Sequence, residues 1–311
     1  MLNQKNNFFS CAKIDFMKVH RINFFFSLLF FIASILLTIS RGLNVGTDFA
    51  GGIVLEIVSP NSININNLRS VVASVEKEAV VQSLESKISE VSGYGSGFII
   101  KIAKKTNSNQ KISEEVRLAI NANFADIEYL KVESVGPQVG REMINKSIIA
   151  LVLSFLSIFI YIWCRFNWQF GIGGLMALFH DAVITLGFFS LTQIEFNLTS
   201  IAAILTIIGY SINDSVVIYD RIRENIRKTP ATSLVNIINS SINSTLSRTI
   251  LTAGATIFSL LALIFFGGDS LFSFSLSTFF GIIIGTYSSI YISAPILFYF
   301  EKKSLIRGVK F

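Results

Sequence analysis

Long, unbroken stretches of apolar residues dominate this chain. Six of them reach the length of about 18 residues or more that a helix needs to cross a bilayer. A long segment of mixed polarity follows the first stretch, and the other five come in quick succession. We therefore predict membrane-spanning helices over residues 22–40, 147–164, 171–191, 198–219, 249–266 and 274–300.

The segment between the first two spans has the patterns of a small α+β domain. Its apolar residues alternate in some stretches, as in half-buried strands, and follow a helical period in others. The pattern predicts strands over Gly52–Ser59, Ala79–Leu84, Gly97–Ala103 and Ile127–Val135, and helices over Asn66–Lys77 and Ser113–Phe124. The order β-α-β-β-α-β favours a ferredoxin-like split βαβ unit. Residues 85–95 show no clear pattern.

The positions of Lys and Arg predict how the chain is oriented. These residues gather at the N-terminus, in the 165–170 turn, over 220–248 and at the C-terminus, and they are absent from the connections 192–197 and 267–273. Cytoplasmic loops carry the excess of positive charge. We therefore expect a cytoplasmic N-terminus (1–21), an extracytoplasmic domain (41–146), five further spans (147–300) and a cytoplasmic C-terminus (301–311). The first span has no small-x-small cleavage site and is expected to be a retained anchor.

Composition supports a polytopic α-helical membrane protein. The 311 residues are 51% hydrophobic and only 15% charged, which excludes an ordinary soluble enzyme. The net charge of +6 does not indicate nucleic-acid binding, because the basic residues flank apolar spans. Cys11 and Cys164 are too far apart for a metal or redox motif, and the sequence has no nucleotide-binding glycine loop. We expect no metal site and no cofactor.

Several polar residues lie inside the predicted spans, where an ionisable group costs several kcal/mol and requires a partner or a function. The third span carries His180 and Asp181, the fourth Asn213 and Asp214, and Arg248 begins the fifth. A protonatable carboxylate near an arginine is what a proton relay needs. Asp214 could instead be an inert hydrogen-bonded acid or ligate sodium, and His180 is more typical of a contact between helices than of a proton shuttle.

Small side chains recur at helical spacing and form a stripe on each of the last four long spans. Such stripes let helix backbones approach closely in a membrane. On the sixth span a simple packing seam is favoured. Glu195 and Asp269 fall in loops, where we expect them to be solvated. The stripes are Gly174, Ala177, Asp181 and Thr185; Ala202, Thr206, Gly209 and Asn213; Arg248, Thr252, Ala255 and Ser259; and Ser277, Gly281, Gly285 and Ser289.

Six separated motifs resemble those of the SecF family of protein-export membrane subunits and occur in the order found in that family. The family is related to the RND superfamily of proton-driven transporters. These motifs cover the chain from about residue 42 to 295. The motifs are Gly46–Gly52, Val135–Gly140, Leu178–Asp181, Gly209–Val217 continuing into Asp220–Asn225, Leu246–Thr249 and Gly285–Ser289.

The resemblance implies half of an RND-type transporter that pairs with a SecD half in the bacterial inner membrane. The pair would associate with the SecYEG channel and use the proton gradient to draw secretory preproteins outward after SecA-driven entry. Asp214 and Arg248 would form the proton-path pair with Asp181 in support, and Asp48, Gly51 and Gly52 would shape a hinge below the outer domain. We expect the third to sixth spans to face SecD, with Ala177 and Ala202 at the contact.

An intramembrane aspartyl protease is the alternative from another class, with Asp181 and Asp214 as its dyad. Such proteases typically carry Gly-x-Gly-Asp at the second acid, and here the residues are Ser211–Asp214. A nearby Arg248 would also keep an acid ionised, whereas a dyad must share a proton. A non-enzymatic transport role is therefore favoured.

Overall fold

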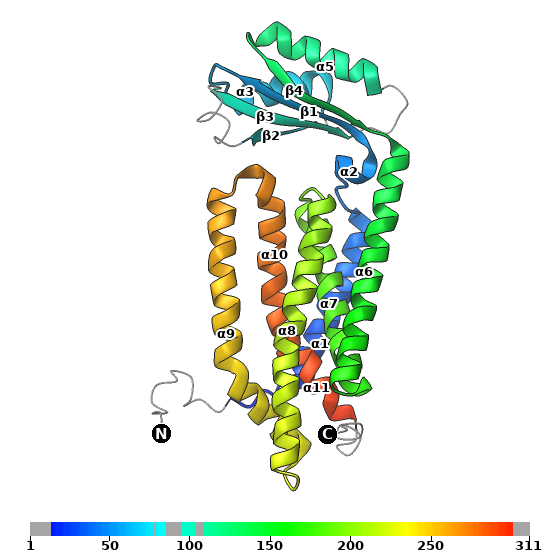
Figure 1. Ribbon diagram of the computed structural model, residues 1–311, viewed down its shortest axis with the longest axis vertical. Helices are drawn as coiled ribbons and strands as arrows, with labels where there is room; N and C mark the ends of the chain where they lie inside the picture. The colour runs from blue at the N-terminus through cyan, green and yellow to red at the C-terminus, as the bar shows by residue number, and fades with distance from the viewer. Residues whose placement is uncertain (1–13, 78, 85–94, 104–108, 301–311) are drawn as a thin grey trace.

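The structure is a computed structural model that describes residues 14–77, 79–84, 95–103 and 109–300. A bundle of long helices forms one end of the molecule, and a small α+β unit covers the other (Figure 1). The short helix α2 (Thr47–Ala50) lies at the junction between them. Most of the predicted termini, and residues 85–94, lie outside the described residues.

Six helices of the described chain are long and apolar enough to cross a membrane, which confirms the predicted number of spans. The sixth is composite, because the α-helix α10 passes into a π-helical turn, η1, and then into two short helical pieces. The spans are α1 (His20–Arg41), α6 (Pro137–Arg165), α7 (Trp168–Thr192), α8 (Leu198–Lys228), α9 (Leu234–Phe266), and α10 (Gly268–Ser288) with η1 (Ser289–Ser293), α11 (Ala294–Ile296) and η2 (Leu297–Tyr299).

Several helices extend beyond the predicted apolar stretches. Helix α6 begins at Pro137. Proline suits this position because it has no backbone N–H, and the N–H groups of a first helical turn have no partner within the helix. Helices α8 and α9 continue past the predicted membrane boundary between them, and buried isoleucines such as Ile226 and Ile238 belong to the apolar cluster there. Hydropathy predicts only the apolar parts of these helices, because the turns beyond them are too polar to be predicted as membrane spans.

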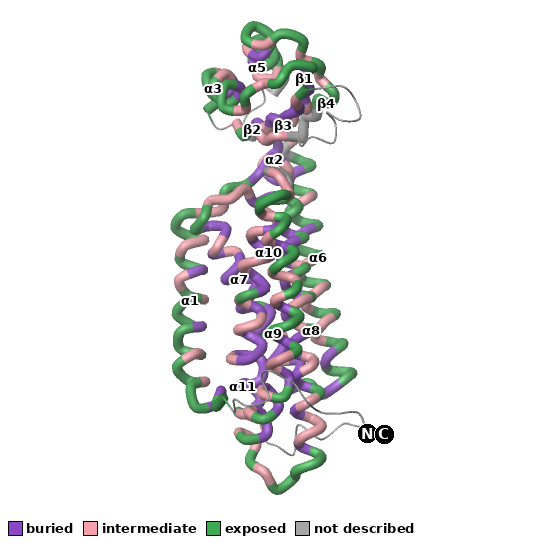
Figure 2. Tube along the Cα trace, turned by 90° about the vertical axis from the view of Figure 1, so that its left-hand side faces the viewer, coloured by how far each residue is buried: buried purple, intermediate pink, exposed green. Residues whose placement is uncertain are grey.

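The α+β unit contains a four-stranded antiparallel sheet in the order β2-β3-β1-β4. The chain order β-α-β-β-α-β matches the prediction. Helices α3 and α5 cover the face of the sheet that is turned away from the bundle (Figures 1 and 2). The elements are β1 (Gly52–Ser59), α3 (Ile65–Val75), β2 (Val80–Leu84), β3 (Ser96–Ala103), α5 (Asn109–Asn123) and β4 (Glu128–Val135).

Burial within the bundle is uneven. Helices α7, α8 and the sixth span have half or more of their apolar windows buried, whereas α1, α6 and α9 are largely exposed. Figure 2 shows the buried trace concentrated at the centre of the bundle and α1 exposed along most of its length. The polar residues predicted within the third and fourth spans therefore lie on two of the three most buried helices.

Candidate functional site

Asp181 lies at the centre of the bundle and is fully buried, at 0% exposed. Its Oδ1 contacts His180 Nδ1 at 3.0 Å. Its Oδ2 accepts hydrogen bonds from Ser211 Oγ on α8 and Ser288 Oγ on α10, both at 2.7 Å. Three helices thus meet at one carboxylate. Gly285 allows this approach, because a Cβ there would lie 3.0 Å from the Cβ of Ser211.

Asp214 is the second buried carboxylate and is 8% exposed. Thr249 Oγ1 on α9 donates to its Oδ1, and Ser289 Oγ on the sixth span donates to its Oδ2 at 2.8 Å. The neighbouring Arg248 is exposed, and no ion pair joins it to Asp214 among the residues that the structure describes. The predicted pair is therefore adjacent in the fold, but the direct partner of the acid is Thr249.

The two acids do not bond to each other within the described chain, and each is satisfied by its own set of hydroxyl groups. A proteolytic dyad needs two carboxyls that share one proton. This geometry does not support the protease alternative. The described residues also contain no cluster of three or more His, Cys, Asp or Glu side chains that could hold a metal ion.

His180 and Asn213 occupy different environments. His180 is buried and stacks on the Phe31 ring of α1, with centroids 6.3 Å apart. Its Nε2 has no hydrogen-bond partner among the described residues, and its ring borders a cavity of about 150 Å³ between α1 and α7. Asn213 is exposed on the outer side of α8. His180 therefore belongs to the interior of the bundle, whereas Asn213 lies on its surface.

The small-residue stripes divide into two groups. Those on α7 and on the sixth span are buried within this chain, and at Gly281 a Cβ would lie 2.1 Å from the side chain of Ile207. The expectation that Ala177 faces a partner is wrong, because this residue is 0% exposed inside the chain. The exposed stripes are Ala202, Thr206, Gly209 and Asn213 on α8, and Arg248, Thr252, Ala255 and Ser259 on α9.

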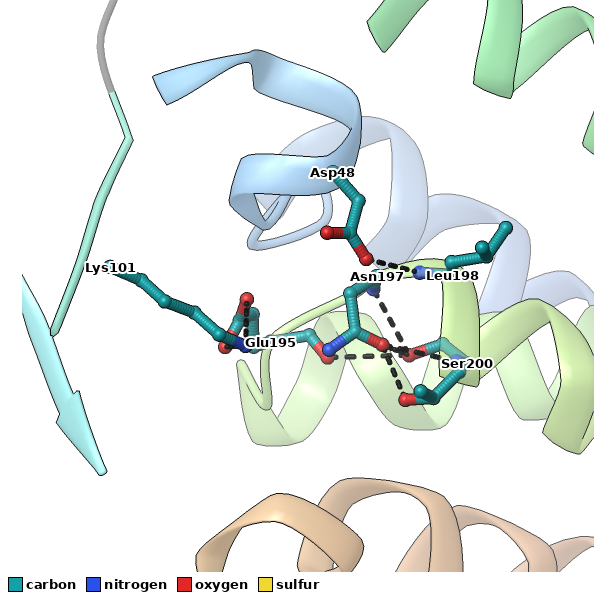
Figure 3. A network of polar contacts seen from close by, with 7 residues as sticks. Asp48, Lys101, Glu195, Asn197, Leu198 and Ser200 are labelled. Atoms are coloured by element: carbon teal, nitrogen blue, oxygen red, sulfur yellow. Dashed lines mark hydrogen bonds and ion pairs between the residues drawn. The ribbon is translucent and has the colours of Figure 1, made fainter. Parts of the chain in front are cut away.

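A polar network joins the bundle to the α+β unit at the start of α8 (Figure 3). Asp48 Oδ2 on α2 accepts a hydrogen bond from the backbone N–H of Leu198 at 3.0 Å. Asn197 and Ser200 form a reciprocal capping box at the same helix end. Asp48 therefore satisfies one of the free N–H groups of α8, and its negative charge lies at the positive end of that helix.

The same network corrects the expectation for Glu195. This side chain is not solvated, because it forms an ion pair with Lys101 of β3 at 3.3 Å and the two side chains are only 11% and 17% exposed. Close packing continues at Gly46, where a Cβ would lie 2.4 Å from Glu195 Oε1. At the base of β1, Gly51 adopts φ of 76°, a conformation that favours glycine. Asp269 lies in the first turn of α10.

Sequence reasoning found both acids but missed most of their partners. Thr249, Ser211, Ser288 and Ser289 complete the two sites, and none of them stands out in the sequence as an acid partner. A hydroxyl in a membrane helix commonly bonds to its own backbone. One signal was available, since Ser289 lies on a small-residue stripe, whereas Ser211, one helical turn before Asp214, bonds to Asp181 instead.

The sequence is similar to that of known protein-export membrane proteins. Residues 115–303 match the family model described as protein export membrane protein SecD/SecF, C-terminal. The chain is 46% identical to protein translocase subunit SecF of Rickettsia rickettsii over 299 residues, which cover 95% of this chain and 94% of that protein. It is 44% identical to the corresponding subunit of Rickettsia prowazekii, with 95% and 93% covered.

Two solved structures of SecDF have a fold similar to that of this chain. The chain is similar to a crystal structure of SecDF from Thermus thermophilus, described as a translocon-associated membrane protein, with a TM-score of 0.76 and 32% identity. A SecDF structure in a super-membrane-facing form gives a TM-score of 0.72 and 34% identity. In both cases 92% of this chain is covered, but only 38% of the longer SecDF chain.

Proposed function

The chain belongs to the SecD/SecF family of protein-export membrane proteins, and on this basis we propose that it acts as the SecF-type subunit of a proton-coupled export complex. It is a multi-pass membrane protein with a transport role. A SecD half is the proposed partner. This chain matches only 38% of the longer SecDF chain, and the rest of that chain is available to hold a second half. The complex would act with SecYEG and SecA on secretory preproteins.

The observation that carries the proposal is the pair of buried carboxylates, Asp181 and Asp214, on the two central helices α7 and α8. In the described chain Asp214 accepts hydrogen bonds only from neutral hydroxyls. A carboxylate held this way can take up a proton without breaking an ion pair. Protons entering under a membrane potential supply about 2.3 kcal/mol per charge for each 100 mV. Asp214 is therefore the proposed proton-binding group, with Asp181 beside it.

Arg248 contributes to this pathway by its charge. It lies on the exposed side of α9, directly before Thr249, whose hydroxyl bonds to Asp214, and it forms no ion pair with that acid within the described chain. Its long side chain can extend toward the headgroups or toward the interior. We assign it the role of a mobile cation that favours the ionised form of Asp214 when it approaches.

The SecD half is proposed to cover the exposed polar stripes of α8 and α9. Lipid cannot satisfy the side chain of Asn213, and small residues such as Gly209 permit close helix contact. A Cβ at Gly209 would meet nothing within 4 Å in this chain, so space remains there for another helix. The buried stripes on α7 and the sixth span are internal seams.

The remaining assignments concern orientation and movement. We propose an inner-membrane location with both termini cytoplasmic and the α+β unit, residues 41–146, on the periplasmic side. The sheet order β2-β3-β1-β4 supports a ferredoxin-like fold for that unit. Asp48 bonds to the start of α8, and Gly51 and Gly52 have positive φ values where the chain enters β1, which supports their proposed role as a hinge.

The test of proton coupling is Asp214→Asn in the assembled complex. The variant keeps the shape of the side chain but cannot titrate, so export should fall to the level measured with the proton gradient collapsed. The readout is preprotein transport into vesicles, with and without an imposed gradient. Asp220→Asn is the matched control, because Asp220 lies on the same helix and is exposed. Full gradient-driven export by Asp214→Asn would overturn the proposal, and Asp181 would become the next candidate.

The partner surface is tested by cysteine crosslinking in the membrane. Ala202→Cys should crosslink to a cysteine on the SecD half, because Ala202 is exposed on α8. Ala177→Cys should not, because Ala177 is enclosed within this chain. The yield is measured by gel shift at equal expression. Crosslinks from Ala177 but not from Ala202 would contradict the assignment.

A further inference from the structure

Two consecutive serines on the sixth span contact both buried acids. Ser288 Oγ donates to Asp181 Oδ2 at 2.7 Å, and Ser289 Oγ donates to Asp214 Oδ2 at 2.8 Å. Both serines are fully buried. The acids themselves belong to different helices, α7 and α8. Within the part of the chain that the structure describes, the sixth span thus touches both carboxylates through adjacent residues.

Each serine hydroxyl has a second acceptor on its own helix. Ser288 Oγ lies 3.1 Å from the carbonyl oxygen of Gly285, and Ser289 Oγ lies 2.9 Å from that of Thr286. A hydroxyl carries a single proton, so it can donate fully to only one of its two acceptors. An ionised carboxylate is the stronger acceptor. A protonated carboxyl can itself donate to the serine oxygen, which leaves the serine proton to the backbone.

The backbone changes its helix type at this point. The α-helical part of the span ends at Ser288, and the π-helical turn η1 begins at Ser289. A π turn accommodates an extra residue and is common at functional sites. In a regular α-helix, consecutive side chains point about 100° apart. The change of helix type therefore lies where adjacent serines reach two acids on two different helices.

We propose that Ser288 and Ser289 are a positioning pair through which the sixth span responds to the protonation of either Asp181 or Asp214. The inference rests on the proposed proton coupling and goes beyond it, because it names the element that detects the proton. When either acid takes up a proton, its serine turns from the carboxylate to the carbonyl of its own helix. The tie between that helix and α7 or α8 is thereby weakened.

Other charged or titratable groups approach the pair from the neighbouring helices. His180 of α7 contacts Asp181, and Arg248 of α9 directly precedes Thr249, which bonds to Asp214. Tyr219 of α8 bonds instead to Ser293, at the end of the π turn, and Tyr287 of α10 bonds to the backbone of Asn23 on α1. His180 and Arg248 are therefore held constant in the test, and only the serine hydroxyls are changed.

The experiment compares Ser288→Ala and Ser289→Ala in the full chain, assembled with its SecD partner in proteoliposomes. Gradient-driven export is measured across a range of pH. Removing a donor to the ionised carboxylate favours the protonated acid, so the midpoint of the pH profile should rise by about one pH unit, tenfold in proton concentration. Ser277→Ala is the matched control, because Ser277 is buried on the same span and its Oγ donates only to backbone carbonyls.

The outcomes separate this inference from the proposed function. If export by the wild-type complex does not depend on the proton gradient, the proposed function itself is wrong. Gradient-dependent export with the same pH profile in Ser288→Ala, Ser289→Ala and Ser277→Ala would overturn only the serine pair. Assembly is checked by co-purification of the partner. If an alanine variant fails to assemble, Ser289→Thr is measured instead: it keeps the hydroxyl, so an unchanged midpoint supports the inference and a midpoint raised by a full unit overturns it.

Discussion

The α+β unit and the helical bundle bury different kinds of side chain. The core of the unit consists of aliphatic and aromatic residues such as Leu55, Ile100 and Ile120. The bundle buries apolar clusters as well, but its centre also contains carboxylates and hydroxyls, with Asp181 and Asp214 on its most buried helices. In its proposed location outside the membrane the unit is surrounded by water, so the burial of apolar side chains stabilises its fold. Lipid surrounds the bundle, and there apolar contact between helices has no such advantage.

This difference in buried side chains indicates which of the two regions can hold a proton-binding site. In a small water-exposed unit, a buried acid would reduce an already limited hydrophobic core. In a bundle whose surface is apolar, polar groups at the centre help to hold the helices together and can also bind protons. The proposed proton site therefore lies inside the structural core of the bundle, whereas the described core of the α+β unit consists of apolar residues.

The largest effect is expected from breaking the apolar core of the unit. Leu55 is 0% exposed on the central strand β1, and Leu55→Ala should destabilise the unit by about 2–5 kcal/mol through lost burial and a residual cavity. Leu118→Ala is the control, because Leu118 is 69% exposed on α5, and its cost should stay within about 0.5 kcal/mol. Hydrogen exchange at the β1 amides of the full chain measures both. Equal protection in the two variants would show that the core does not hold the unit.

A smaller effect is expected from overfilling the seam between α8 and the sixth span. Gly281→Ala places a methyl group 2.1 Å from the Ile207 side chain and should cost about 1–3 kcal/mol. Gly254→Ala on α9 is the control, since a Cβ there meets nothing within 4 Å. Thermal unfolding in detergent gives the comparison. If Gly281→Ala is as stable as Gly254→Ala, close glycine packing does not stabilise the bundle.

The smallest effect concerns the joint between the two regions. The Lys101–Glu195 ion pair is mostly buried, so the cost of desolvating both charges offsets much of their attraction, and its coupling energy should be about 1 kcal/mol or less. A double-mutant cycle with Lys101→Met and Glu195→Gln isolates it, and hydrogen exchange at the first turn of α8 is the measurement. Strictly additive effects would mean that the ion pair does not tie the unit to α8.

Hydropathy and periodicity determined much of this protein. The six spans, the strands and helices of the α+β unit, and the positions of Asp181 and Asp214 within spans all follow from the sequence. These features are local, because a bilayer selects for length and apolarity, and strands and helices impose periods of 2 and 3.6 residues. The same patterns predict only the apolar parts of α8 and α9, and both helices continue beyond them.

Tertiary structure decided which groups meet. The α7 stripe, which includes Ala177, is buried within the chain, whereas the α8 stripe is exposed. Glu195 forms an ion pair with Lys101, which lies on a strand far away in the sequence. Tertiary structure also supplied the hydroxyl partners of the two acids. A serine in a membrane helix can bond to its own backbone wherever it lies, so nothing in its local sequence distinguishes one that also reaches a carboxylate. Only the packing of α7, α8 and the sixth span against one another made Ser288 and Ser289 partners of those acids.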